Sequence, residues 1–269
     1  MDHSKLHAEA FFDLDSFDHP LLFEGCRHVW EGLRNIKDYL NEHLEGNVKP
    51  VGSFRQPLVE TIVLWRGRIW RREGFAVLGG DVTQGSFRVR IQGEETGDAV
   101  VLFAGSILWD DQIYLGPGSV VEPGALIQGP TIIGTQTEVR QCAYVRGNCI
   151  IGNRCVVGHT TEIKGSVMLN DAKAGHFAYI GDSILGNRTN LGAGTKLANL
   201  KIKAGTVEVK VGLDRLDTGL RKFGAVLGDD VEIGCNAVTN PGTLMGKGSL
   251  VFPLTSVPSG YHEPKSVLR

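Results

Sequence analysis

From Leu115 onward, the chain carries an aliphatic side chain at every sixth residue. The residue two places before each following aliphatic position is usually small. Ten positions keep this step without a break: Leu115, Val121, Ile127, Ile133, Val139, Val145, Ile151, Val157, Ile163 and Leu169. Repeats of this kind are typical of a parallel β-helix, in which each hexad forms a short strand and a turn. Three hexads close one triangular coil, so equivalent residues of successive coils should stack about 4.8 Å apart.

The regular step is lost after Leu169, because the next place in the count is Gly175, beside His176. The spacing therefore predicts a distorted coil between residues 170 and 184, with His176 inside it. The six-residue step returns at Leu191 and again from Leu227 to Val257. We expect the deviating segment to carry the chemistry, because regular hexads are only a scaffold.

Residues 1–103 lack the hexads and read as a small α/β region. Apolar residues at helical spacing from Phe23 to Leu44 predict a helix of roughly 20 residues, ended by Gly46. Strands are expected at 61–65, 87–91 and 98–103. The expected domains are an α/β region at 1–103, a β-helix at 104–260 and a C-terminal tail at 261–269.

Composition narrows the choice of partners. A net charge of −2 gives no sign of a nucleic-acid or membrane partner, and no run approaches 18 apolar residues. The start of the chain is acidic and lacks an apolar core, so we expect no secretory signal. The five cysteines are an odd count, and Cys149 and Cys155 occupy buried positions of the repeat. Reduced thiols in a cytoplasmic protein are the expected reading.

Two cations stand one coil apart, because Lys164 falls three hexads after Arg146. Stacked cations repel by roughly 1 kcal/mol or less in water, so their pairing suggests a phosphate or another dianion between them. Tyr179, Asn190 and Asn199 follow as hydrogen-bonding side chains near the same edge. The alternative is that these are ordinary solvated residues at the exposed corners of a solenoid.

These residues together resemble the left-handed β-helix acyltransferases, and above all the acetyltransferase domain of bifunctional amino-sugar-1-phosphate acetyltransferases that also carry a uridyltransferase domain. The resemblance covers roughly residues 104–260. It rests on Lys173-Ala174-Gly175-His176, Tyr179, Gly181-Asp182 and the run 190–195, together with Arg146 and the segment 162–164. It implies a mainly β protein: a left-handed parallel β-helix of hexapeptide repeats with a small N-terminal α/β region.

The resemblance also implies a mechanism. His176 would act as the general base that frees the amine of an amino-sugar 1-phosphate to attack the thioester of acetyl-CoA. Arg146, Lys164, Tyr179 and Asn190 would bind the sugar phosphate, and Asn199 and Cys235 would lie at the acetyl-group and CoA site. The family implies a homotrimer with sites between subunits, and no metal.

Some residues depart from that pattern. Asn199-Leu200-Lys201-Ile202 lacks the family's Tyr and Asp, and the segment 201–222 is longer and carries a charge of +3. These features are more similar to archaeal-type sugar-1-phosphate nucleotidyltransferases with an acetyltransferase tail. Residues 1–103 are too short for a nucleotidyltransferase domain, and Leu78-Gly79-Gly80-Asp81 reads as a turn, so we predict no nucleotidyl transfer.

Two other functions stay open on sequence alone. A non-catalytic trimeric module could use Arg146 and Lys164 as an anion sensor and regulate or dock a separate nucleotidyltransferase. A β-helix hydratase would need three zinc-binding histidines, for which this half offers His159, His176 and His262. The sequence alone leaves open which amino sugar or acyl group is used, and what residues 1–103 bind.

Overall fold

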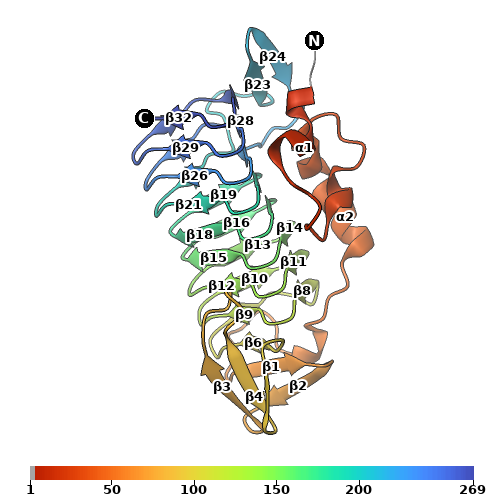
Figure 1. The fold of residues 1–269 in the computed structure, drawn as a ribbon. Helices are drawn as coiled ribbons and strands as arrows, with labels where there is room; N and C mark the ends of the chain where they lie inside the picture. The colour runs from red at the N-terminus through yellow and green to blue at the C-terminus, as the bar shows by residue number, and fades with distance from the viewer. Residues whose placement is uncertain (1–3) are drawn as a thin grey trace.

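The computed structural model describes residues 4–269 and contains a left-handed parallel β-helix shaped as a three-sided prism (Figure 1). Each coil contributes one short strand to each of three sheets, which we name A, B and C in the order in which the chain visits them. All strands in the coils pair parallel with the coils above and below. Nine parallel strands in sheet A, β6 to β32, correspond to about nine coils.

The strands of the prism are two to four residues long. Sheet A contains β6 (Val100–Leu102), β9 (Val120–Val121), β12 (Glu138–Val139), β15 (Val156–His159), β18 (Lys173–His176), β21 (Asn190–Leu191), β26 (Glu232–Ile233), β29 (Leu250–Val251) and β32 (Val267–Leu268). Sheet B contains β7 (Ile107–Leu108), β10 (Leu126–Gln128), β13 (Tyr144–Arg146), β16 (Glu162–Lys164), β19 (Tyr179–Gly181), β22 (Lys196–Leu197), β27 (Val238–Thr239) and β30 (Ser256–Val257). Sheet C contains β8 (Ile113–Leu115), β11 (Thr131–Ile133), β14 (Cys149–Ile151), β17 (Val167–Met168), β20 (Ile184–Leu185), β25 (Ala225–Leu227), β28 (Thr243–Met245) and β31 (Gly260–His262).

The prism interior is a continuous stack of aliphatic side chains, as the hexads predict. Val145 and Ile163 pair in register with Ile127 and Ile180 on the inner side of sheet B, and all four are fully buried. Small residues such as Ala125, Ala143 and Cys149 fill the space between them. The coil of three hexads is confirmed from Ile127 to Ile163.

The place where the chain loses step differs from the expectation. Ile151 pairs with Met168, and Met168 pairs with Leu185, so each of these two coils is a residue shorter than three hexads. Met168 therefore points into the core, whereas Leu169 packs outside against the N-terminal segment. The inward residue near the histidine is Ala174, not Gly175.

Each of these two coils is shortened by one residue at the corner between sheets B and C. One corner uses two residues in the left-handed region, Gly147 at φ +80° and Asn148 at φ +50°. The next coil turns with Gly165 alone at φ +52°, and the following coil with Asp182 alone at φ +46°. Glycine adopts this conformation without strain and aspartate tolerates it. The distortion thus lies at Gly165, before the expected stretch of 170 to 184, and at Asp182, inside it, whereas β18 with His176 keeps its register with β15.

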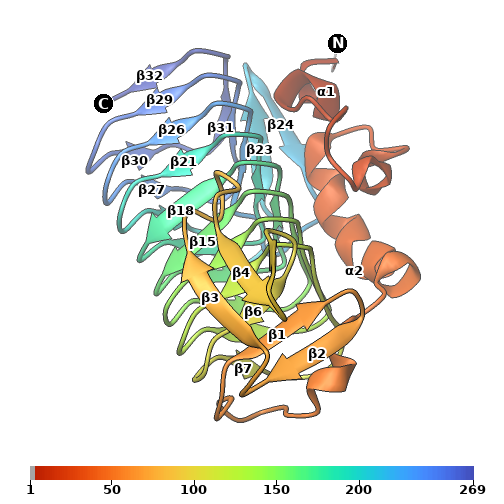
Figure 2. The same cartoon turned by 60° about the horizontal axis from the view of Figure 1, so that its bottom comes forward.

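The N-terminal segment is a chain of short helices that covers the outer face of sheet C (Figures 1 and 2). The predicted helix of about 20 residues is corrected to the 12-residue α2 (Gly32–His43), because the preceding turns are separate. Phe11, Trp30 and Ile36 pack on outward side chains of sheet C such as Ile150 and Val226. The other helices of the segment are η1 (Ser4–Leu6), α1 (Ala8–Phe11), η2 (Pro20–Phe23), η3 (Val29–Glu31) and η4 (Lys49–Val51).

A β lobe closes the N-terminal end of the prism (Figure 2). β1 (Ile62–Trp65) pairs antiparallel with β2 (Arg68–Arg71) and with β6, so the lobe continues sheet A. β3 (Phe75–Gly79), β4 (Arg88–Ile91) and β5 (Glu94–Thr96) form a separate antiparallel sheet that covers the lower part of sheet A. The strands expected near 61–65, 87–91 and 98–103 are present as β1, β4 and β6.

Two boundaries differ from the expected 104–260. The parallel ladder begins at β6, and the expected tail contains β31 and β32, which pair with β28 and β29. A hairpin of β23 (Glu208–Val211) and β24 (Asp214–Asp217) leaves the prism between β22 and β25. Within residues 4–269, no helix combines the length and apolarity of a membrane span.

Candidate functional site

His176 is the last residue of β18, at the corner where the chain passes from sheet A to sheet B. Its Cα pairs in register with that of His159, one coil away, so two histidines stand side by side at this corner. The His176 side chain is exposed, and its ring contacts Phe177 with centroids 6.2 Å apart. The exposed imidazole can therefore be reached by a ligand from outside the prism.

The two histidines differ in their hydrogen bonding. His159 donates from Nδ1 to the carbonyl oxygen of Gln141 at 3.1 Å, which fixes its tautomer. In the part of the chain that the structure describes, no hydrogen bond engages the ring of His176. Both ring nitrogens of His176 are therefore left without a hydrogen-bond partner among residues 4–269.

One column of residues runs along this corner. Backbone hydrogen bonds link its members, because Phe177 donates to His159, Gly194 to His176, Asn236 to Ala193 and Leu254 to Cys235. Cys235 is exposed and follows His176 two coils along the column, about 10 Å away. The small side chain of Ala193 separates them. His176 and Cys235 thus share one open corner.

Arg146 and Lys164 lie at the opposite edge of sheet B. They end β13 and β16, whose register pairs Val145 with Ile163, so the two cations are stacked one coil apart as predicted. Each has its own carboxylate, however. Arg146 Nη1 lies 2.6 Å from Glu162 Oε1, and Lys164 Nζ lies 2.7 Å from Asp182 Oδ2.

These carboxylates correct the argument that two stacked cations need a dianion between them. The hydrogen bond that Arg146 donates to Glu162 raises the pKa of Arg146 above its usual value, with the Glu162 charge adding to the effect. Mutual repulsion is relieved inside the chain, and an incoming phosphate would have to compete with two carboxylates. The pairing leaves both cations near one corner, where they can still be reached.

Asn199 joins the Lys164 ion pair. Its Nδ2 donates to Asp182 Oδ2, the same oxygen that Lys164 contacts. Asn199 is almost buried, whereas the side chains of Lys164 and Asp182 are about one-fifth exposed. The sequence prediction did not include Asp182 in the site. Three hexads counted from Lys164 fall on it, whereas the observed register pairs Lys164 with Gly181.

The sequence suggested that Tyr179 and Asn190 lie near the same edge, but the structure places them on different sheets. Tyr179 lies on the outer face of sheet B, in register between Glu162 and Lys196. Asn190 lies on the outer face of sheet A and donates to Glu232 Oε2 at 2.9 Å. The structure therefore brings Tyr179, Arg146, Lys164 and Asn199 to sheet B and its far corner, and keeps Asn190 with the sheet leading to His176.

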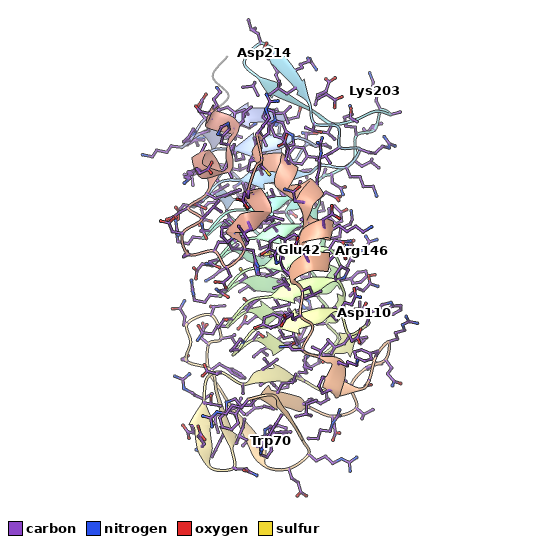
Figure 3. All side chains as sticks on the ribbon, turned by 90° about the vertical axis from the view of Figure 1, so that its right-hand side faces the viewer. Glu42, Trp70, Asp110, Arg146, Lys203 and Asp214 are labelled. Carbon is purple, nitrogen blue, oxygen red and sulfur yellow. The ribbon has the colours of Figure 1, made fainter. Side chains whose placement is uncertain are left out.

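A single chain does not bring His176 and the two cations together. They are separated by the width of sheet B, where a strand such as β19 spans on the order of 10 Å. The outer face of sheet B is also the least covered, since its outward side chains from Ile107 to Ser256 are all at least partly exposed. Figure 3 shows Arg146 about midway along the prism.

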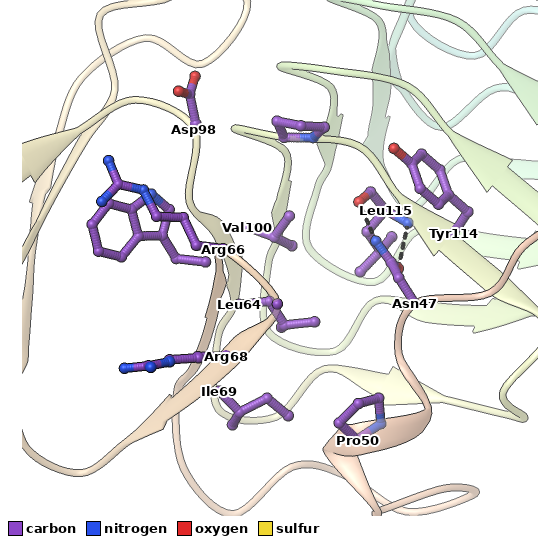
Figure 4. Close-up of a pocket in the computed structure, with 13 residues that line it drawn as sticks. Asn47, Pro50, Leu64, Arg66, Arg68, Ile69, Asp98, Val100, Tyr114 and Leu115 are labelled. Atoms are coloured by element: carbon purple, nitrogen blue, oxygen red, sulfur yellow. Dashed lines mark hydrogen bonds between the residues drawn. The ribbon is translucent and has the colours of Figure 1, made fainter.

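A separate cavity of about 200 Å³ lies at the N-terminal end, where the lobe meets the first coils (Figure 4). The Arg66 guanidinium stacks 4.0 Å above the ring of Trp65 and pairs with Glu94 at 2.9 Å. Asn47 exchanges two hydrogen bonds with the backbone of Leu115. None of the predicted site residues lines this cavity. In the described residues, no group of three or more His, Cys, Asp or Glu is placed to hold a metal ion.

Comparisons with known proteins agree with the motifs in the prism. A family model described as the GMPPB C-terminal domain matches residues 127–250. A bifunctional sugar-1-phosphate nucleotidylyltransferase/acetyltransferase of Sulfurisphaera tokodaii is 37% identical over 94 residues, which cover 35% of this chain and 23% of that protein. The bifunctional protein GlmU of Methanococcus vannielii is 34% identical over 138 residues, which cover 51% of this chain and 27% of that protein.

Among solved structures, the UDP-N-acetylglucosamine acyltransferase of Francisella novicida is similar with a TM-score of 0.39 and 14% identity, over 59% of this chain and 58% of that one. The chain spans about a quarter of the length of the curated relatives named above. Over its C-terminal half, the chain therefore resembles the bifunctional sugar-1-phosphate nucleotidylyltransferase/acetyltransferases.

Proposed function

We propose that this protein is an acetyl-CoA-dependent N-acetyltransferase that acts on an amino-sugar 1-phosphate, such as glucosamine- or galactosamine-1-phosphate. The observation that carries the proposal is the exposed imidazole of His176, free of hydrogen bonds within residues 4–269, at a corner that it shares with Cys235. The names of the relatives, which include an acetyltransferase, support the same chemistry.

In the proposed reaction, His176 accepts one proton from the neutral amine of the sugar and later passes it to the leaving thiolate. The amine nitrogen then forms a bond to the thioester carbonyl carbon, and the bond from that carbon to sulfur breaks. The thiolate of CoA leaves and takes up a proton, so the products are the N-acetylated sugar phosphate and free CoA. No covalent enzyme intermediate is needed, and a positioned base of this kind contributes about 10²- to 10⁴-fold to the rate.

The acceptor phosphate is assigned to Arg146 and Lys164 of a neighbouring chain, because the two groups lie at opposite edges of sheet B in one chain. This assignment requires an oligomer, and we propose a homotrimer packed through the uncovered face of sheet B. Tyr179 lies on that face and would contact the sugar, while Asn199 holds Asp182 beside Lys164. Asn190 and Cys235 belong to the His176 side of such a site.

The test is direct. The full chain is incubated with acetyl-CoA and each amino-sugar 1-phosphate, and the acetylated sugar is measured by mass spectrometry, because exposed Cys142 and Cys235 would consume a thiol reagent. His176→Asn should lose about 10²-fold or more in rate. His159→Asn, the matched change one coil away, should stay within a few-fold. Equal losses in both variants would remove His176 as the base.

Subunit sharing has its own readout. Light scattering should give the mass of three chains. Mixed oligomers of His176→Asn and Lys164→Ala chains should recover activity that neither variant has alone, because some interfaces then hold both intact groups. Monomers, or mixtures without recovery, would refute a shared site.

A second function is favoured by one observation, namely that Arg146 and Lys164 are already ion-paired with Glu162 and Asp182. Paired cations fit a non-catalytic trimeric module that partners a sugar nucleotidyltransferase and binds no anion at this corner, unlike the anion sensor expected from the sequence. Absence of acetylated product with every amino-sugar phosphate, together with retained trimer formation, would support this alternative.

A further inference from the structure

A cavity of about 700 Å³ lies beside the C-terminal coils, between the hairpin and the prism. One wall is the loop that follows Asn199, a second is formed by β23 and β24, and the floor consists of corner residues of two successive coils. Its lining includes Leu200, Lys201, Ile202, Lys203, Lys210 and Arg215. Its volume is more than three times that of the cavity in Figure 4.

The wall residues belong to an excursion that the prism does not need. Leu197 ends β22 and Ala225 begins β25, so the whole segment 198–224 intervenes at a corner that other coils turn within a short loop. The parallel ladder continues across the gap, because Leu185 pairs with Leu227. The excursion therefore adds a surface to the scaffold without being required to close the coil.

The cavity carries an excess of positive charge. Four cations and one carboxylate line it, and the carboxylate of Glu208 lies 3.5 Å from Arg215. Within residues 4–269, Lys201, Lys203 and Lys210 form no ion pair. Four cations of the prism differ, since Arg146, Lys164, Arg154 and Arg188 each have a carboxylate within 2.8 Å.

Three unpaired ammonium groups around one concavity attract anions. A phosphate monoester carries about two negative charges, so three lysines are better matched by a diphosphate. Lys201 and Lys203 lie on the loop wall and Lys210 on the hairpin wall, so an anion between the walls would meet charges from both. Figure 3 shows Lys203 near the end of the molecule that carries the hairpin.

Apolar side chains stand beside these charges. Ile202 is fully exposed, Leu200 is 46% exposed, and Pro241 and Pro258 line the same cavity. Exposed aliphatic and proline side chains give a flat apolar group such as a nucleobase a surface to pack on. The volume is also within the range of about 300–1,000 Å³ in which small-molecule ligands bind.

We propose that this cavity binds a nucleoside diphosphate moiety, with Lys201, Lys203 and Lys210 contacting the phosphates and Ile202 and the prolines contacting the base. The site is distinct from the His176 corner of the same chain, because it opens from the corner between sheets B and C. Two sources could supply such a moiety: the diphosphate end of CoA, or a sugar nucleotide or its nucleotide fragment. Binding does not depend on acyl transfer.

The experiment is calorimetric titration of the full chain with UDP, ADP, CoA and inorganic phosphate, at low and at high salt. Lys203→Gln/Lys210→Gln should weaken nucleotide binding by about tenfold or more. The matched control is Lys37→Gln/Lys265→Gln, which removes the same charge from exposed lysines outside the cavity and should leave binding unchanged. Binding should also weaken as salt increases.

The results distinguish the two possible sources of the nucleotide moiety, and they test this inference separately from the proposed acyl transfer. UDP or ADP bound at least as tightly as CoA identifies a free nucleotide or sugar nucleotide as the source, and CoA bound more tightly than both identifies the acyl donor. Inorganic phosphate bound as tightly as UDP, equal affinity in both double variants, or binding of an acidic peptide but of no nucleotide would overturn the inference. His176→Asn should lose acyl transfer but bind nucleotide normally. An unmodified chain that binds nucleotide but acetylates no amino-sugar 1-phosphate would refute the proposed function alone.

Discussion

Asp229 is a buried carboxylate that ties the N-terminal segment to the prism, and its removal gives a quantitative test of how that segment is held. The side chain is 2% exposed. Oδ2 accepts from the backbone N–H of Asp13 at 2.7 Å, while Oδ1 accepts from the backbone N–H of Asn187 at 2.7 Å and from Asn187 Nδ2 at 3.0 Å. Asp229→Ala therefore removes the acceptor of three donors at once.

The cost follows from which donors can reach water. Asn187 is 2% exposed, so its backbone N–H would be left buried without a partner, which costs about 1–3 kcal/mol. Asn187 Nδ2 also donates to the carbonyl oxygen of Asp13 at 2.8 Å and water can reach the Asp13 N–H, so these two donors add less. Asp229→Ala should lower the free energy of unfolding by about 1–4 kcal/mol.

Urea denaturation measures this change, and hydrogen exchange localises it, because residues 4–44 should lose protection before the coils do. The control is Asp230→Asn, the next residue, which keeps a side chain that tolerates its φ of +60° and removes only a surface pair with Arg188. That change should cost about 1 kcal/mol or less. An Asp229→Ala protein as stable as Asp230→Asn, with unchanged exchange in residues 4–44, would refute the role of this carboxylate.

Three further predictions concern the corner residues, the thiols and a half-buried histidine. Gly158→Ala should destabilise the coils by about 1–3 kcal/mol or more and reduce acyl transfer, because its Cβ would overlap the carbonyl group of Gly175. Gly175→Ala, whose Cβ meets nothing within 4 Å, should be tolerated, and equal melting temperatures for both variants would contradict this. Iodoacetamide at pH 8 should modify Cys142 and Cys235 in the folded protein but spare Cys149 and Cys155, because burial raises the pKa of the Cys149 and Cys155 thiols to about 12. Peptide mass spectrometry measures the modification at each cysteine. Early labelling of Cys149 or Cys155 would count against this prediction. Burial lowers the pKa of His19, so the folded state binds fewer protons than the unfolded one, and stability should fall as the pH drops below about 6.5. His19→Asn should reduce that slope in urea titrations at pH 5 to 7.5, and an unchanged slope would show that other groups cause it.

Much of the fold can be predicted from the hexads, because a β-helix core repeats one environment and each coil must supply an aliphatic residue at a fixed interval. Ile127, Val145 and Ile163 follow that rule and stack as expected. Met168 and Leu169 show where counting fails. Both are apolar and both are buried, one inside the prism and the other under the N-terminal segment, so hydrophobicity alone does not tell them apart.

The site is less predictable, since it depends on which edge of a sheet each residue occupies. The spacing of Arg146 and Lys164 predicts that they stack, and they do. It does not show that Glu162 and Asp182 pair with them, because these partners are set by corner geometry rather than by period. Nor does spacing separate the His176 corner from the Lys164 corner, which requires knowing that residues 177–181 cross sheet B.

The excursion after Leu197 shows how such a scaffold acquires new parts. Each coil is held by the coils on either side, so a corner can be opened and lengthened while the backbone ladder stays intact across the break. A lineage could graft, enlarge or delete an appendage at one corner without redesigning the architecture beneath it. Differences in ligand preference among prisms of this kind should therefore be sought first in the segments inserted at their corners.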